Sequence, residues 1–368
     1  MSPFPVNLVC PRCRTLDAHG ELKIVLLEPC DSTGEDRAGG RCPGCGTNYP
    51  GVEDVHCVPP DPDAFRQAQA EALDPGWNGS CTTRESAALV CSEFGNLEPG
   101  SDSFREAFLP GVYAAANFPE GLEPEALRTE LTCNLELPAL LRNWLRAHPP
   151  RAVASAECAL DVGCGPGRLL HELAPLQPNG CIGFDVRLSM LRLARRLADC
   201  SETFVPFRIE GRRFIPLRIS KRRLNNDPLH FVQGDIISPP FEAEVFPLVS
   251  AVSLLDTVTD PLFALGQLDA LVCPGGLLIL ATPYHWEPGA TSPENWLSTA
   301  EHSATEVIRI ALAGGHACLP HLNYEILEEE PFLPWVLPSH GRLVHRFFLD
   351  VILARKAMAN ETRQPPVD

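Results

Sequence analysis

The chain has 368 residues, 45% of them hydrophobic, and a formal net charge of −17. This length accommodates a full α/β core beside a smaller domain, and the acidic balance disfavours a protein whose whole surface binds nucleic acid. No run of 18 apolar residues occurs and the N-terminus lacks a signal-peptide pattern, so we expect a soluble cytoplasmic protein with no membrane partner. In that compartment the 15 cysteines are better interpreted as thiols and metal ligands than as disulfides.

Two C-x-x-C knuckles mark the first part of the chain, residues 1–60. Cys10 and Cys13 form one knuckle, and Cys42 and Cys45 form the other. Each can place two thiolates on one ion, and together they close a tetrahedral site, so we expect a structural zinc ribbon whose folding depends on the metal. A redox pair is the alternative. The apolar segment between the knuckles, 21–27, is predicted to be a strand.

Residues 61–150 are predicted to form a helical cap or linker. Apolar residues at helical spacing predict helices at 62–73 and 124–147, whereas 91–100 and 109–119 have the composition of loops. We interpret this part as a cap over a catalytic sheet. The alternative is a lid that carries substrate contacts, with Tyr113 and Asn117 as the candidates.

A glycine-rich loop opens the third part, residues 151–357. It follows an apolar strand with the pattern D-x-G-x-G-x-G, in which Asp161 precedes Gly163, Gly165 and Gly167. Glycines let the backbone pass close to a ligand, and an acidic residue at this place disfavours a phosphate and favours a cationic ligand. A dinucleotide-binding loop is the alternative, but Arg168 occupies the position where that pattern needs Gly or Ala.

Three later strands also end in polar residues. Asp185 ends the second strand, where a carboxylate can accept both hydroxyls of a ribose. Asp235 and Ile236 follow the third strand, where they are expected to meet an adenine; the alternative is that Asp235 caps a helix. The fourth strand, 246–253, ends at Ser253, and a P-G-G turn precedes a fifth strand. The predicted cofactor-binding residues are Asp161, Gly163, Gly165, Gly167, Asp185, Asp235, Ile236 and Ser253.

These features, in this order, resemble the class I S-adenosylmethionine (SAM) methyltransferases. The resemblance implies an α/β fold, a doubly wound Rossmann-like sheet over 151–357, with SAM as cofactor, the zinc ribbon and cap before it and a tail at 358–368. The ribbon carries a second resemblance: the C-P-G-C-G turn followed by Tyr49-Pro50 is similar to the zinc-ribbon subunit that activates tRNA and release-factor methyltransferases. That resemblance implies a structural zinc in a module that stabilises the catalytic domain, here fused in cis.

A basic insertion separates the second helix of this domain from its third strand. Alternating residues predict a β-hairpin at about 203–223, and residues 187–223 carry eleven Arg or Lys against three acids. Solvated surface charge is one interpretation. The other is a flap that attracts an anionic substrate, such as RNA or a small carboxylate.

The residues after the fourth strand restrict the methylated group. Enzymes that methylate amino groups of adenine or glutamine carry [ND]-P-P-[YF] there, whereas this chain has Ser253-Leu254-Leu255-Asp256. Asp256 is either a base or anchor for a cationic substrate, or a helix N-cap. We expect Asp256 and Tyr284 to be the catalytic residues and Cys164, in the glycine loop, to have a packing role.

The loop after the fifth strand, 282–297, combines aromatic, hydroxyl, amide and carboxylate groups that suit a small polar ring. It resembles the S-P-Y-x-W…P-x-E-N-W-L segment of the mercaptohistidine N-methyltransferase domain of ovothiol-forming enzymes. The resemblance implies N-methylation of a small histidine-like or mercaptohistidine-like metabolite in a pocket lined by Tyr284, Trp286, Asn295 and Trp296. The rivals are methylation of RNA or a translation-associated protein, and an interaction module without catalysis.

Overall fold

The computed structural model describes ten stretches of the chain. They are residues 4–16, 22–29, 39–52, 55–65, 83–122, 125–151, 156–200, 202–220, 228–286 and 289–358. Within these stretches, no helix combines the length and apolar character needed to cross a bilayer.

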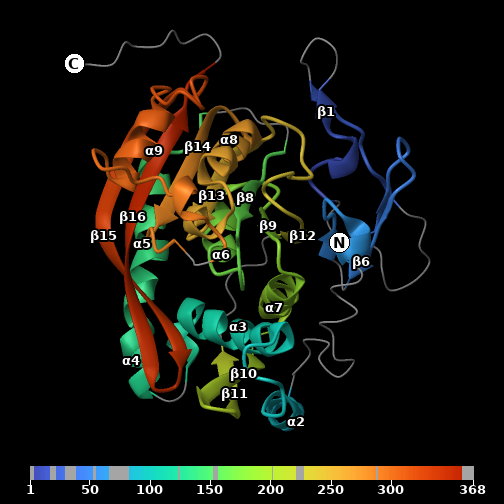
Figure 1. Cartoon of the computed structure of the whole chain (residues 1–368), viewed down its shortest axis with the longest axis vertical. Coiled ribbons are helices and arrows are strands. Elements are labelled where there is room, and N and C mark those ends of the chain that lie inside the picture. Colours follow the sequence, from blue (N-terminus) through green and yellow to red (C-terminus); the bar gives the residue numbers. More distant parts are fainter. Residues whose placement is uncertain are drawn as a thin grey trace.

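A nine-stranded, mostly parallel sheet forms the centre of the molecule (Figure 1). Its order is β15-β16-β14-β13-β8-β9-β12-β7-β6, in which the strands from β14 to β7 run parallel and β16 runs antiparallel to β14 and β15. The five parallel strands expected from the sequence are all present, so the predicted fold class is confirmed. The bounds are β6 (Gly51–Val52), β7 (Val55–Cys57), β8 (Ala159–Val162), β9 (Cys181–Asp185), β12 (Leu229–Gln233), β13 (Phe246–Val252), β14 (Val272–Thr282), β15 (Tyr324–His340) and β16 (Leu343–Lys356).

Helices cover both faces of this sheet, which explains why its strands are continuously apolar. On β14, Leu277 and Ile279 pack into one core with α5, α6 and α7, whereas Leu278 and Leu280 pack into the other with α8 and α9. Successive side chains of a strand point to opposite faces, so both faces need apolar residues. The helices are α5 (Glu136–Ala147), α6 (Leu170–Leu173), α7 (Leu188–Asp199), α8 (Pro261–Leu271) and α9 (Ala304–Leu312), with the 3-10 turn η4 (Ala174–Leu176) after α6.

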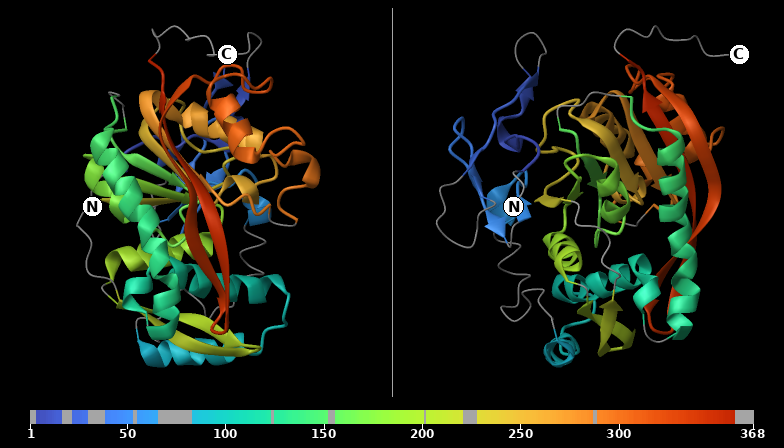
Figure 2. Two further views of the ribbon diagram at one scale, coloured as in Figure 1. Left: turned by 90° about the vertical axis from the view of Figure 1, so that its left-hand side faces the viewer. Right: turned by 180° about the vertical axis from the view of Figure 1, so that it is seen from behind.

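The N-terminal ribbon is joined to the sheet and is not a detached module. β7 pairs in parallel with β12, with Cys57 opposite Gln233, and the Val9 N–H donates to the Pro240 carbonyl at 2.9 Å. Figure 2 shows the ribbon packed along this edge of the sheet. The strand expected at 21–27 is shorter: of its described residues, 22–27, only β2 and a single bridge at Leu26 are extended and paired. The ribbon elements are η1 (Pro11–Cys13), β1 (Thr15–Leu16), β2 (Leu22–Lys23), β3 (Glu28–Pro29), β4 (Gly40–Arg41) and β5 (Asn48–Tyr49).

A cap of helices and one hairpin lies at the end of the sheet where the parallel strands finish (Figure 1). The predicted hairpin is confirmed, and helix 124–147 is present as two helices joined by a 3-10 turn. Of the helix expected at 62–73, residues 62–65 are helical and 66–73 lie outside the described residues. The cap comprises α2 (Arg84–Phe94), α3 (Asp102–Asn117), η2 (Pro119–Gly121), α4 (Glu125–Leu131), η3 (Thr132–Leu135), β10 (Glu202–Glu210) and β11 (Arg213–Ser220).

The loop expected at 109–119 is largely wrong, because most of it is helical, whereas the loop expected at 91–100 is confirmed at 95–100 and helical only in its first four residues. Residues 91–94 end α2, and 109–117 belong to α3, which contains Pro110. Gly111 has a packing role: a Cβ there would lie 2.1 Å from the Pro206 carbonyl oxygen, so only glycine lets α3 lie directly on β10. A glycine that normally weakens a helix is here required by the neighbouring strand.

The long hairpin of β15 and β16 runs past the sheet into the cap (Figure 1). Asn134, only 2% exposed, fastens it there: its amide donates to the Ala116 and Val336 carbonyls at 2.9 and 2.7 Å, and its oxygen accepts from the Val336 N–H at 2.7 Å. Because every hydrogen-bonding group of this buried amide is used on α3 or β15, the cap is tied to the sheet through the hairpin.

Candidate active site

The glycine loop leaves β8 beside the end of β9. Gly163, Gly165 and Gly167 have φ values of 73°, 52° and 83°. A Cβ on Gly165 would meet nothing within 4 Å, so open space lies beside the loop at this residue. The Asp185 carboxylate accepts the Gly165 N–H at 2.9 Å and the Arg187 N–H at 2.8 Å. The structure therefore brings the loop and the acid of the second strand together, as the sequence predicts.

Asp161 is a buried carboxyl at the base of this loop, 3% exposed. Burial raises its pKa to about 7, and the charge of Asp185 adds to the rise, whereas the Ser250 hydroxyl, donating at 2.7 Å, opposes it. A carboxyl whose pKa lies near neutral pH becomes fully ionised when a cation binds beside it. Ser250 is a partner that the sequence analysis did not identify.

Asp235 follows β12 in a turn. Its carboxylate accepts the Ile237 N–H at 3.0 Å, and no helix begins within residues 236–245, so the helix-cap alternative is wrong. Ile236 is buried, and the Val58 N–H donates to the Gln233 carbonyl at 2.8 Å. The turn at Asp235 and Ile236, which is predicted to contact the adenine, therefore lies directly against the segment at Val58 that leaves the ribbon.

The ends of β13 and β14 hold three non-glycine residues in the left-handed region. The φ values are 51° at Ser253, 52° at Tyr284 and 53° at Trp286. Such conformations cost roughly 1–3 kcal/mol each and persist only where surrounding contacts enforce them, which is a frequent property of functional sites. One such contact is the hydrogen bond from the Ser253 N–H to the Ala281 carbonyl, 2.7 Å long.

Asp256 lies in the short turn η5 (Leu255–Thr257) and is 2% exposed. Its carboxylate accepts the His285 N–H at 2.8 Å and so holds the loop after β14. The N-cap of α8 is instead Asp260, which accepts the Phe263 N–H at 2.9 Å. The N-cap interpretation of Asp256 is therefore wrong, and its carboxylate faces the predicted acceptor loop.

Three of the four predicted pocket residues lie together. The Trp286 and Trp296 rings stack with centroids 6.2 Å apart and an angle of 13°, and Tyr284 is 6.2 Å from Trp286. Asn295 differs: its side-chain amide donates to the Thr259 carbonyl at 2.8 Å. Burial raises the pKa of Tyr284 to about 12, so its phenol is neutral at physiological pH.

The structure adds residues that no local motif revealed. The Thr305 hydroxyl is hydrogen-bonded to the Tyr284 hydroxyl at 3.1 Å and also to the Asp350 carboxylate. Asp350 lies on β16 opposite Thr282, and its other oxygen accepts the Phe332 N–H at 3.1 Å. In the sequence, Asp350 could have been noticed only as an isolated acid between the apolar residues of a strand.

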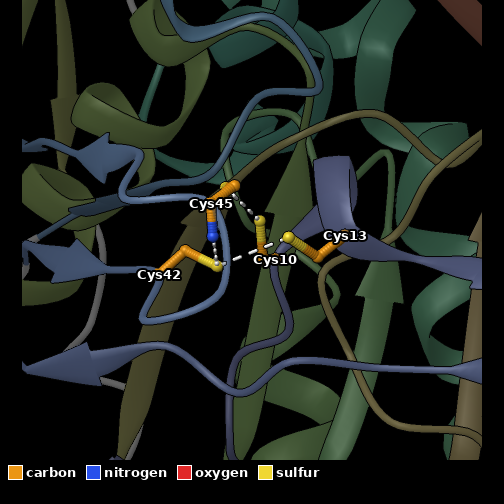
Figure 3. Close-up of side chains that lie close together, drawn as sticks. All are labelled: Cys10, Cys13, Cys42 and Cys45. Atoms are coloured by element: carbon orange, nitrogen blue, oxygen red, sulfur yellow. Dashed lines mark hydrogen bonds between the residues drawn. The ribbon is translucent and has the colours of Figure 1, made fainter.

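The four knuckle cysteines converge in the ribbon (Figure 3). The Sγ atoms of Cys10 and Cys45 are 3.7 Å apart, those of Cys13 and Cys42 are 3.6 Å apart, and all four lie within 4.8 Å of one another. Four thiolates bound tetrahedrally at about 2.3 Å from a zinc ion would be roughly 3.8 Å apart, so the cluster fits this metal. The Cys45 N–H also donates to the Cys42 sulfur at 3.4 Å.

The basic hairpin is largely paired within the cap. Arg208 lies over the Phe104 and Phe108 rings, with its guanidinium carbon 5.8 and 5.0 Å from their centroids. The other arginines of the hairpin, on β11 and in the turn before it, have acidic partners, and Lys221, Arg222 and Arg223 lie outside the described residues. These ion pairs are Arg212–Glu98 (3.6 Å), Arg213–Glu210 (4.0 Å) and Arg218–Glu202 (2.9 Å).

A family model described as a methyltransferase domain matches residues 135–323, just over half of the chain. The protein belongs to this methyltransferase family. It is therefore an enzyme that uses SAM, rather than an interaction module. The matched region contains every predicted cofactor and acceptor residue; the ribbon and the hairpin of β15 and β16, with Asp350, lie outside it.

A search of curated proteins found no match. Several solved structures show weak similarity to this methyltransferase. Magnesium protoporphyrin IX methyltransferase from Synechocystis is 13% identical, covers 73% of this chain and 96% of its own, and has a TM-score of 0.41. The YcgJ protein of Bacillus subtilis is 14% identical over 60% of this chain and 98% of its own, with a TM-score of 0.37. A complex of the Haloferax volcanii Trm112 methyltransferase activator with a methyltransferase gives 14% identity over 59% of this chain and 88% of that one, with a TM-score of 0.35.

Proposed function

We propose that this methyltransferase methylates a ring nitrogen of a small histidine-like or mercaptohistidine-like metabolite. The carrying observation is the wall formed by Tyr284, Trp286 and Trp296 beside the buried Asp256. Aromatic faces next to a carboxylate suit a planar ring that carries N–H groups or positive charge. The resemblance of the loop sequence to the mercaptohistidine N-methyltransferases supports the same choice of acceptor.

The cofactor half of the site provides groups that fit SAM. SAM, when bound, supplies a methyl group on a cationic sulfur, so the protein mainly has to orient the acceptor and remove its proton. We assign the ribose hydroxyls to Asp185 and the adenine to Asp235 and Ile236. The glycines at 163, 165 and 167, with Ser253, would lie along the cofactor, and Asp161 would provide negative charge near its cationic groups.

Asp256 and Tyr284 have different roles in the proposed reaction. Asp256 accepts the proton that the ring nitrogen loses and holds the acceptor loop through His285. Tyr284 is a neutral phenol because burial raises its pKa to about 12, so it positions the acceptor by hydrogen bonding and does not act as a base. Trp286 and Trp296 orient the ring, and Asn295 stabilises the loop through the Thr259 carbonyl.

We assign the four-cysteine cluster to a structural zinc that holds the ribbon against the sheet. The Sγ spacing supports this assignment, as does the resemblance of the ribbon to the activator subunit. Elemental analysis of the purified protein should give one zinc per chain. Clearly less than one metal per chain would contradict the assignment.

A methyl-transfer assay with labelled SAM tests the acceptor. Two pools are offered to the enzyme: small imidazole and thiol metabolites, and total RNA. Label in the small-molecule pool would support the proposal. Label in the RNA would instead favour the alternative, methylation of RNA or a translation-associated protein by way of the ribbon and the hairpin at 203–223.

A further inference from the structure

Arg168 connects the glycine loop to the cap. It directly follows Gly167, and its side chain is only 11% exposed. The guanidinium is ion-paired with Glu120 of η2, lies 3.4 Å from the Glu172 carboxylate of α6, and has its central carbon 5.8 Å from the Phe118 ring centroid. Arg168, which departs from the dinucleotide-binding pattern, is therefore the residue whose side chain extends from the glycine loop to the cap.

The contacts of Arg168 belong to a longer chain of alternating charges. Glu172 is 8% exposed, and it also pairs with Arg142 of α5 at 3.1 Å. The series Glu120, Arg168, Glu172 and Arg142 thus joins the cap, the loop and two helices of the catalytic domain. A charge this shielded from water is costly without a partner, so Arg168 favours the arrangement in which the cap contacts the loop.

We propose that Arg168 is a positioning residue that couples the cap to cofactor binding. Its pairing with Glu120 holds the loop around Gly165 and Gly167 in the conformation that receives SAM, and bound SAM in turn stabilises the cap on the loop. The coupling must act equally in both directions, because it is a free energy shared by two equilibria. This inference rests on the proposed SAM site.

The first test is SAM binding by full-length protein carrying Glu120→Gln. Titration calorimetry should show a dissociation constant about three- to tenfold higher than that of the wild type, since Glu120 is 44% exposed and Glu172 still contacts Arg168. The matched control is Glu125→Gln: Glu125 is also in the cap, but it pairs with Arg128 of its own helix at 3.6 Å and, among the described residues, makes no ion pair with the glycine loop. Glu125→Gln should bind SAM as the wild type does.

A double-mutant cycle separates the coupling from general destabilisation. In an Arg168→Met background, Glu120→Gln should cause no further loss of SAM affinity, because the partner is already absent. Glu120→Asp, which keeps the charge, should recover part of the wild-type affinity. Additive losses in the two variants would overturn the coupling.

Hydrogen exchange provides a readout that does not depend on activity. SAM should slow amide exchange at residues 113–122 in the wild type, and this protection should be much smaller in Glu120→Gln. Equal protection and equal affinity in the two proteins would overturn the inference while the SAM site remained. Absence of SAM binding by the wild type would overturn the SAM site and the coupling with it.

Discussion

The candidate active site has a cofactor half, beside β8 and β9, and an acceptor half, at the ends of β13 and β14. The two halves make their sharp backbone bends in different ways. Beside β8, the bends fall on Gly163, Gly165 and Gly167, whereas at the ends of β13 and β14 they fall on Ser253, Tyr284 and Trp286. Glycine adopts a left-handed conformation without a steric penalty, but other residues need outside support. The bends of the glycine loop therefore follow from local sequence, whereas the bends at Ser253, Tyr284 and Trp286 depend on contacts with distant residues.

The hydrogen bonds of the acceptor half show this dependence. Asp256 reaches 29 residues along the chain to His285, and Thr305 reaches 21 residues to Tyr284 and 45 residues to Asp350. From this difference we expect substitutions near the glycine loop to change SAM binding. Substitutions in the acceptor loop, or in the distant residues that support it, should change turnover. Four predictions test this separation.

The largest effect is expected for Asp185→Ala. Removing this carboxylate leaves the Gly165 and Arg187 N–H groups without their acceptor and removes the proposed ribose contact. We expect the SAM dissociation constant to rise by about 30- to 100-fold, measured by calorimetry. Asp260→Ala is the control, because Asp260 also accepts a backbone N–H but lies in the acceptor half. A comparable loss of SAM affinity in the control would contradict the separation of the two halves.

Trp286→Ala should have the next largest effect, and on the other half. Loss of the ring removes the stacking partner of Trp296, so we expect kcat/KM for the acceptor to fall by about 10- to 30-fold, with SAM affinity within about twofold of the wild type. Steady-state kinetics and calorimetry measure the two quantities. Phe263→Ala, which removes an exposed ring on α8, is the matched control. The pocket assignment fails if Trp286→Ala weakens SAM binding as much as it weakens turnover.

The pKa of Asp161 predicts how SAM binding depends on pH. The cationic groups of SAM favour the ionised carboxylate, and burial raises its pKa to about 7, so affinity should fall as the pH drops through that value. Between pH 8 and pH 6 we expect a loss of roughly tenfold. Asp161→Asn cannot ionise at this position, so its titration should be flatter. Identical profiles for the two proteins would show that Asp161 does not face the cofactor.

The smallest effect is expected for Asp350→Asn. The amide keeps the shape of the side chain but weakens its hydrogen bonds to Thr305 and the Phe332 N–H, so Tyr284 is held less firmly. We expect kcat to fall by about fivefold without a change in SAM affinity. Glu330→Gln, in the same hairpin, should leave both quantities unchanged. A change in SAM affinity for Asp350→Asn would remove the distinction between the two halves.

The cap shows where local sequence patterns failed. Pro110 and Gly111 predicted a loop, but α3 continues through them, because the cost of this pair is offset by the close contact between Gly111 and β10. The hairpin at 203–223 was predictable because alternation and its turn are properties of neighbouring residues. The basic charge of the hairpin did not by itself reveal its role, since its partners lie about 100 residues earlier, in α3 and the loop before it: Phe104, Phe108 and Glu98.

The sequence by itself determined the five parallel strands and their places along the chain, the glycine loop, the acids that follow it and the four converging cysteines. These features depend on apolar period, glycine conformation and ligand spacing, all of which act over a few residues. Only the tertiary structure decided that β7 extends the sheet, that Arg168 contacts the cap, and that Asp350 supports Tyr284 through Thr305. Those contacts arise when surfaces from distant segments pack together, and no local pattern specifies which residues will then face each other.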